Sequence, residues 1–131
     1  MDLDFSTFDP STALAAIESC TKSEILARTP CLPPYLALES MAQACGMHLR
    51  HLHDFKIQAF LVSVSDLVET PGLENRPLTI RANLTAETTV GASYLVAVDD
   101  GPACRILIGR QASDQPDTFF RSRFSCLRKT S

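Results

Sequence analysis

The pattern of apolar positions changes along the chain from a helical period to a strand period. Between residues 33 and 53, apolar side chains recur every three or four positions, the spacing that forms a buried stripe on an α-helix. The members of this stripe are Leu38, Met41, Ala42, Cys45, Leu49 and Leu52. A helix of about 20 residues spans roughly 30 Å. The pattern therefore predicts one long helix packed against the rest of the protein.

A period of two follows the helix and predicts a half-buried antiparallel sheet. The clearest strand is 78–87, which alternates strictly between apolar and polar residues. The side chains expected to face inward are Leu78, Ile80, Ala82, Leu84 and Ala86. Further predicted strands are 60–67, 93–98 and 104–110, with a hairpin turn at 99–101 and a loop at 69–77. One helix followed by antiparallel strands indicates an α+β fold.

Composition narrows the class of protein. The chain has 131 residues, 45% of them hydrophobic and 21% charged, which is typical of one globular domain. A net charge of −3 argues against nucleic-acid binding, and neither a membrane span nor a signal sequence is predicted. The cysteines are Cys20, Cys31, Cys45, Cys104 and Cys126. An odd number without Cys-x-x-Cys spacing predicts reduced thiols in a cytoplasmic protein, with no metal or cofactor.

A row of polar or small residues lies beside the apolar stripe of the helix. Its members are Glu39, Gln43, Gly46 and Arg50. Burying an ionisable group costs several kcal/mol unless it is paired, so a carboxylate in an apolar helix needs a reason. Gly46 lowers helix stability by roughly 1 kcal/mol relative to alanine, for which close approach of a backbone or a ligand would compensate. Glu39 and Gln43 are therefore the candidate catalytic pair.

The phrase around Glu39 resembles the central helix of a known enzyme family. Residues 33–46 read Pro-Pro-Tyr-Leu-Ala-Leu-Glu-Ser-Met-Ala-Gln-Ala-Cys-Gly. This is similar to the hotdog-fold β-hydroxyacyl-acyl-carrier-protein dehydratases, most of all their divergent aryl-polyene-type members. The specific match covers roughly residues 32–46, and Pro34 replaces the family's glycine.

The resemblance implies both a fold and a function. The fold would be an antiparallel sheet wrapped around a long central helix, as one domain over 1–131 with 112–131 as a C-terminal extension. The family's catalytic glutamate falls on Glu39, with Gln43 beside it, and Pro33, Pro34 and Gly46 are candidate substrate-binding residues. The implied partners are a second copy of the chain, forming a homodimer, and a thioester of acyl carrier protein or coenzyme A.

Two terminal segments allow alternatives. Either residues 13–19 and 24–28 are two strands joined by a turn at 20–23, which the hotdog fold requires, or the chain forms a helix that runs through Cys20 with Asp9 as its N-cap. We adopt the strands. In the tail 111–131, apolar side chains recur at helical spacing at Phe120, Phe124 and Leu127. The tail is interpreted as a short helix covering the sheet with a solvated basic face, or as a docking patch for an acidic partner such as an acyl carrier protein.

One departure from the family concerns the catalytic histidine. In the dehydratases it usually lies fourteen residues before the glutamate, a position that Ile25 occupies here. The chain's histidines are His48, His51 and His53, which we interpret as polar residues stabilising the helix C-terminus rather than as metal ligands. Cys31, just before the helix, has no histidine nearby in sequence and is interpreted as a small apolar residue.

Three functions remain open from the sequence. The first is a dehydratase-like protein acting on 3-hydroxyacyl thioesters, with a relocated acid/base or with a histidine supplied by a partner. The second is a hotdog thioesterase that uses Glu39 alone as base or nucleophile. The third is a non-catalytic subunit that binds an acyl chain or has a structural role, with Glu39 hydrogen-bonded to Gln43 or to backbone.

Overall fold

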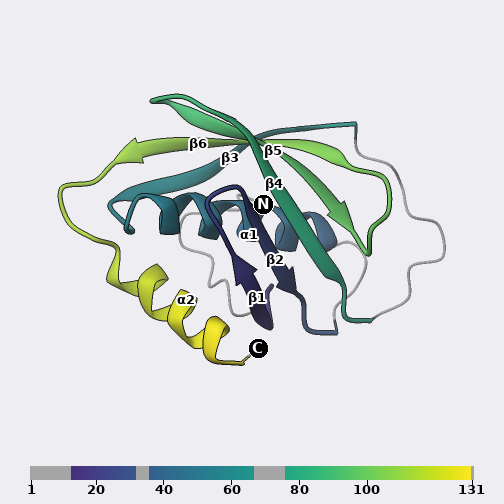
Figure 1. The fold of residues 1–131 in the computed structure, drawn as a ribbon. Coiled ribbons are helices and arrows are strands. Elements are labelled where there is room, and N and C mark those ends of the chain that lie inside the picture. The colour runs from purple at the N-terminus through teal and green to yellow at the C-terminus, as the bar shows by residue number, and fades with distance from the viewer. Residues whose placement is uncertain (1–12, 32–35, 67–75, 131) are drawn as a thin grey trace.

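The structure, a computed structural model, describes residues 13–31, 36–66 and 76–130 (Figure 1). Its elements in chain order are β1 (Ala16–Cys20), β2 (Glu24–Arg28), α1 (Ala37–Leu52), β3 (Ile57–Ser65), β4 (Thr79–Glu87), β5 (Gly91–Val98), β6 (Cys104–Ala112) and α2 (Thr118–Thr130). The predicted helix and the four strands after it are thus confirmed. The N-terminal segment forms strands, so the alternative of a helix reaching Cys20 is wrong.

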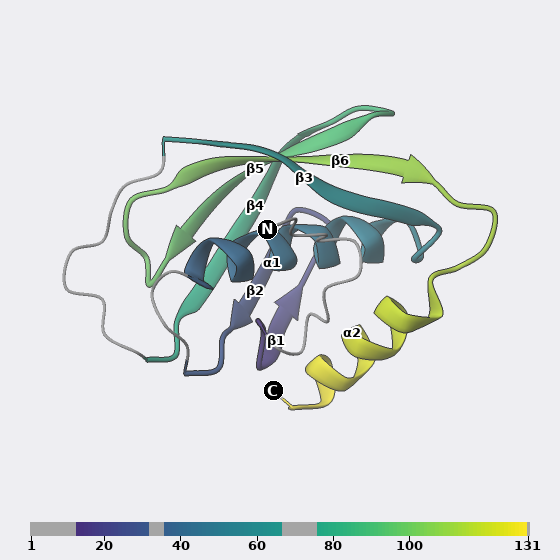
Figure 2. The ribbon, with the colours of Figure 1, turned by 180° about the vertical axis from the view of Figure 1, so that it is seen from behind.

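One six-stranded sheet, in the order β1-β2-β4-β5-β6-β3, curls around α1. All of its pairings are antiparallel. Figures 1 and 2 show α1 lying along the inner face of this sheet, while α2 lies below, beside β1. Strand β3 is at one end of the sheet order and contacts α1. These two elements frame the candidate site.

Helix α1 is buried on all its sides rather than along one stripe. Every residue from Ser40 to Arg50 is buried. The concave sheet covers one side, and the N-terminal segment covers another, where the Ser40 hydroxyl donates a hydrogen bond to the Ala13 carbonyl at 2.7 Å. The stripe seen in the sequence is therefore only part of the buried surface. Each polar side chain on this helix must find a partner inside the protein or leave a donor or acceptor unmatched.

Strand β4 follows the predicted alternation only along its first half. Leu78, Ile80 and Ala82 are buried as expected. Ala86, predicted to face inward, is exposed. The register between β4 and β5 shifts between Leu84 and Ala86, where β4 has an extra residue, and beyond this bulge residues 85–87 are exposed on both faces.

The C-terminal segment forms the predicted covering helix. Phe120, Phe124 and Leu127 of α2 are buried, and α2 contacts β1 and α1. Its exposed side carries Arg121, which forms a salt bridge with Asp54 at 3.1 Å. Helix α2 thus closes the side of α1 that the sheet leaves open.

Candidate functional site

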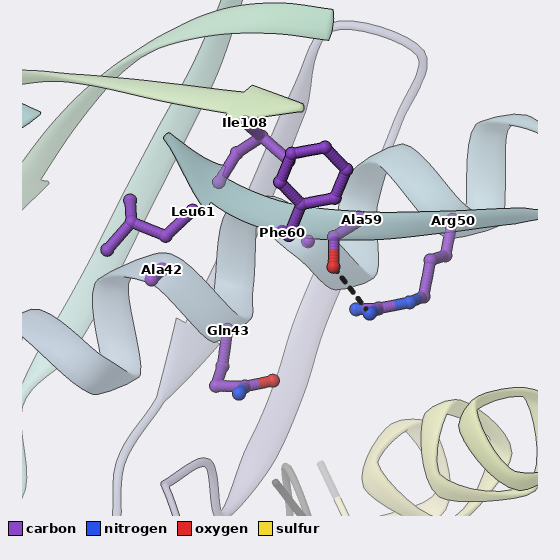
Figure 3. A pocket seen from close by; sticks show the side chains of 8 residues that line it. Ala42, Gln43, Arg50, Ala59, Phe60, Leu61 and Ile108 are labelled. Atoms are coloured by element: carbon purple, nitrogen blue, oxygen red, sulfur yellow. Dashed lines mark hydrogen bonds between the residues drawn. The ribbon is translucent and has the colours of Figure 1, made fainter. Parts of the chain in front are cut away.

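A small depression lies between α1 and the edge strand β3, and it opens to solvent (Figure 3). It is lined by Ala42, Gln43, Gly46, Arg50, Ala59, Phe60, Leu61 and Ile108. Three of the four residues of the polar row on α1 are in this lining. The fourth, Glu39, is one helical turn from Gln43 and is joined to it by a hydrogen bond.

Glu39 and Gln43 form a pair at the start of α1. The Gln43 side-chain amide donates to Glu39 Oε1 at 3.0 Å. Glu39 lies in the first helical turn and is half-buried. A carboxylate there is favoured by the helix dipole, yet burial raises the pKa of Glu39, and the hydrogen bond from Gln43 only partly opposes this. The pair therefore presents a carboxyl group that holds its proton to higher pH than an exposed glutamate.

Gly46 has a different neighbour from the one expected. A Cβ at this position would lie 2.9 Å from Arg50 Nη1 and 3.9 Å from the Ala59 Cβ. Close approach of a second backbone, one of the two expected compensations, is thus not what the structure shows. The missing side chain makes room for the guanidinium of the same helix, which reaches back along α1 toward Gln43 (Figure 3).

Arg50 is a buried cation at the inner end of the depression. It is 3% exposed, its Nη2 donates to the Ala59 carbonyl at 3.0 Å, and its guanidinium stacks 3.6 Å from the centre of the Phe120 ring. Burial lowers the pKa of Arg50 to about 10, and Asp117 acts in the opposite direction. Its Nε has no hydrogen-bond partner among the described residues. Sequence reasoning placed Arg50 on the polar row but gave it no role.

The predicted site residues are placed as follows. Gln43 and Gly46 line the depression and Glu39 adjoins it, whereas Pro33 and Pro34 lie outside the described residues. Their substrate-binding and catalytic roles remain predictions. Cys31 is an exposed free thiol, and its interpretation as a small apolar residue rather than a nucleophile stays a prediction.

The three histidines have three different surroundings. His48 is fully buried, with Nδ1 2.7 Å from the Tyr94 hydroxyl and Nε2 2.8 Å from the Thr21 carbonyl. Burial lowers its pKa. The interpretation of His48 as a residue that stabilises the helix C-terminus is therefore wrong, since it joins three elements inside the core. His53 contacts Glu87.

The neighbouring His51 is exposed and stacks on Phe124, with ring centres 4.5 Å apart. Within the described ranges, no group of three or more histidine, cysteine or acidic side chains is arranged to hold a metal ion.

The position of the family's catalytic histidine is part of the core. Ile25 is 0% exposed on β2, where it pairs with Ala82 of β4. Among the residues that the structure describes, only Gln43 makes a side-chain hydrogen bond with Glu39. The described chain thus brings one carboxyl group to this site with no second titratable group hydrogen-bonded to it.

Comparison with known proteins identifies the fold. No protein-family model and no curated protein sequence matches this chain. Solved structures do match, including a mutant thioesterase from Pseudomonas aeruginosa at 13% identity and TM-score 0.60, covering 73% of this chain and 80% of that one. A thioesterase from Haemophilus influenzae matches at 9% identity and TM-score 0.61, over 76% and 79% of the two chains.

A third match extends over almost the whole chain. It is the dehydratase heterocomplex ApeI:P from Xenorhabdus doucetiae, at 15% identity and TM-score 0.58, covering 93% of this chain and 97% of that chain. These likenesses concern the fold. The hotdog arrangement that the sequence resemblance implied is confirmed. Within the described part of the chain, no helix is long and apolar enough to cross a membrane.

Proposed function

We propose that this hotdog-fold chain acts on acyl thioesters, and that its reaction is the dehydration of a 3-hydroxyacyl thioester with Glu39 as the acid. One observation carries the proposal: a half-buried carboxyl group with a raised pKa is hydrogen-bonded to Gln43 beside the opening between α1 and β3. Its neutral form persists to higher pH than that of an exposed glutamate, which favours a role as general acid. The similarity to a dehydratase heterocomplex over most of the chain supports this choice.

The proposed reaction needs two proton transfers. A base removes the proton from C2 of the acyl group, the electron pair forms the C2–C3 double bond, and the bond from C3 to the hydroxyl breaks. The Glu39 proton passes to the departing hydroxyl, which leaves as water. Gln43 fixes the orientation of the carboxyl group through its amide. Leu36 at the N-cap of α1 makes no side-chain hydrogen bond, so first-turn N–H groups are available to the thioester carbonyl.

We propose that the base comes from a second subunit. Strand β3, nine residues long, ends the sheet order, so one side of its backbone has no strand partner among the described residues. Its outer side chains include Phe60 at 44% and Val62 at 58% exposure. An unprotected apolar edge is prone to pairing. A homodimer joined along β3 would bring a second chain beside the depression that β3 lines. A monomer in sedimentation at micromolar concentration would contradict this assembly.

Hydrolysis of the thioester is the second candidate. It is favoured by the absence of a second titratable group hydrogen-bonded to Glu39 in the described chain and by the similarity to two thioesterases. In that reaction Glu39, ionised, would remove a proton from water as it attacks the thioester carbon, and the thiol would leave with the proton. The carrier, acyl carrier protein or coenzyme A, would be the same for both reactions.

The products of a single incubation distinguish these functions. Purified protein is incubated with 3-hydroxybutyryl thioesters of coenzyme A and of acyl carrier protein, while the unsaturated thioester and the free thiol are measured in parallel. We expect the unsaturated thioester, and we expect Glu39→Gln to reduce its formation roughly a hundredfold or more, the usual range for loss of an acid/base group. Thiol release instead would favour hydrolysis.

The matched control is Glu18→Gln. Glu18 is a partly exposed carboxylate on β1 that pairs with Arg28 at 3.5 Å, and its neutralisation should leave turnover unchanged. Absence of both products with the wild-type protein, together with an unchanged melting temperature of Glu39→Gln, would contradict an enzymatic function and favour a binding subunit.

A further inference from the structure

Arg50 is a buried cation whose donors are only partly matched by the described residues. A guanidinium carries five N–H donors, and the described residues accept one hydrogen bond from it, at the Ala59 carbonyl. Its Nε is buried and has no hydrogen-bond partner within 13–31, 36–66 and 76–130. No described carboxylate forms a salt bridge with it, since Asp117 acts on its charge only from a greater distance. Leaving a buried charge unpaired is costly, and burial of a charge is normally accompanied by an opposite charge.

The guanidinium borders an opening rather than a sealed cavity. Arg50, Gln43 and Gly46 line the same depression between α1 and β3. The absence of a side chain at Gly46 leaves Nη1 beside that depression, 2.9 Å from where a Cβ would be. Figure 3 shows the Arg50 side chain running back along α1 toward the end where Gln43 lies. The unmatched donors are thus positioned to meet a group that enters past Gln43.

The distance between the two polar ends of the depression is short. Gln43 and Gly46 are three residues apart, or roughly 4.5 Å along the helix axis. Glu39 acts at the Gln43 end and the Arg50 guanidinium lies at the level of Gly46. A group held with its thioester at Glu39 would therefore reach Arg50 after only a few carbons. The walls between them are apolar, formed by Ala42, Ala59, Leu61 and Ile108.

We propose that this depression selects short acyl groups that carry a carboxylate at the end remote from the thioester, and that Arg50 binds that carboxylate. The inference rests on the proposed thioester site at Glu39. A planar carboxylate matches the fork of guanidinium donors and supplies an opposite charge in direct contact, which none of the described residues provides. A methyl-ended chain of the same length would leave the Arg50 donors unmatched and would place apolar carbon against a cation. Arg50 would then determine specificity, while Glu39 carries the chemistry.

Binding of unreactive analogues tests the inference without turnover. Three pantetheine amides of one shape differ only at the remote end: succinyl carries a carboxylate, succinamoyl a neutral amide and isohexanoyl two methyl groups. Dissociation constants are measured by calorimetry with the wild-type protein. We expect succinyl to bind at least about tenfold more tightly than isohexanoyl, as for a charge-assisted hydrogen bond, with succinamoyl between them. Equal binding of the three, or tighter binding of isohexanoyl, would overturn the inference.

Variants at Arg50 test whether this residue causes the preference for succinyl. Arg50→Met keeps an unbranched apolar stem and should remove the preference for succinyl, whereas Arg50→Lys keeps the charge and should retain part of it. Arg105→Met is the control, since Arg105 is exposed on β6 and hydrogen-bonds to Ser93. If Arg50→Met does not fold, the comparison of Arg50→Lys with wild type decides: a reduced preference for succinyl in Arg50→Lys would support recognition by Arg50, whereas an unchanged preference, or none in wild type, would overturn it.

The two proposals fail in different ways. Turnover of 3-hydroxybutyryl thioesters depends on Glu39 and tests the reaction. The order of the three dissociation constants depends on Arg50 and tests the selection. Dehydration without a preference for succinyl would retain the proposed function and overturn this inference. A succinyl preference that Arg50→Met abolishes, without turnover of any thioester, would support the binding site and contradict the reaction.

Discussion

His48 and Arg50 are two buried polar residues of the same helix, and their surroundings differ. They are two positions apart, so their side chains leave α1 on roughly opposite sides. Both ring nitrogens of His48 have partners, the Tyr94 hydroxyl and the Thr21 carbonyl. Arg50 has the Ala59 carbonyl for Nη2 and no partner for Nε among the described residues. The His48 side is complete within the chain, and the Arg50 side is not.

This difference separates a structural polar group from a functional one. A buried donor or acceptor that is matched internally strengthens the fold and leaves nothing for a ligand. An unmatched one lowers stability until something binds to it. Glu39, with one hydrogen bond and a pKa raised by burial, belongs to the same incomplete side as Arg50. We therefore expect changes around His48 to affect stability, and changes in the row from Glu39 to Arg50 to affect binding and turnover.

The largest expected effect on stability is that of His48→Leu. Leucine fits the space but leaves the Tyr94 hydroxyl and the Thr21 carbonyl buried without partners, and each such loss costs about 1–3 kcal/mol. The free energy of unfolding should fall by about 3 kcal/mol in urea titrations. His51→Leu, at the exposed C-terminal end of the same helix, should change it by no more than about 0.5 kcal/mol. Equal effects of the two variants would contradict the closed network at His48.

Gly46→Ala changes the side of α1 opposite His48. It should affect kcat/KM more than the free energy of unfolding. The added Cβ would meet Arg50 Nη1 at 2.9 Å and would occupy part of the depression. We expect kcat/KM for the thioester substrate to fall about tenfold, a cost of about 1.4 kcal/mol in transition-state stabilisation. Stability should stay within about 1 kcal/mol of wild type, because alanine favours the helix while Arg50 must move. Unchanged kinetics would show that nothing binds beside Gly46.

The smallest expected effect is on the pH dependence of stability. The contributions of His48 and Glu39 to the free energy of unfolding should change with pH in opposite directions. Burial keeps His48 neutral in the fold, whereas the unfolded chain takes up a proton below about pH 6.5, so its contribution is lost as pH falls through that value. Glu39 has a folded pKa raised above 4.5, so its contribution is present below that value and is lost as pH rises through the folded pKa.

Urea titrations across this range compare the two variants with wild type. Relative to wild type, Glu39→Gln should gain stability as pH rises, and the deficit of His48→Leu should shrink as pH falls below about 6.5. Parallel curves for the three proteins would contradict the assignment of these two groups to buried, titrating positions.

Most of the fold could be predicted from the sequence because it follows from local periodicity. The stripe from Leu38 to Leu52 fixes the helix, and the alternation after Leu78 fixes a half-buried strand. The bulge near Ala86 could not be predicted, since an extra residue within a regular pattern is set by the neighbouring strand β5. The Glu39–Gln43 pair is local, at one helical turn, and its spacing was sufficient to predict it.

Long-range partners account for what the sequence did not reveal. The partners of His48 are 27 and 46 residues away along the chain, so no local pattern distinguished it from a residue at the helix end. The role of Arg50 depends on Ala59 in β3 and Phe120 in α2, which only the folded chain brings together. The polar row was visible in the sequence, but its unmatched donors were not.

The most direct test of the account is where a ligand binds along α1. Nitrogen-labelled protein is titrated with 3-hydroxybutyryl-pantetheine amide, and the amide and side-chain nitrogen signals are followed by NMR. The account predicts shifts at the Gln43 side-chain amide and the Gly46 backbone amide, while the ring nitrogens of His48 stay unchanged. Shifts centred on His48 and Tyr94, or saturating ligand without any change at Gln43 and Gly46, would contradict it.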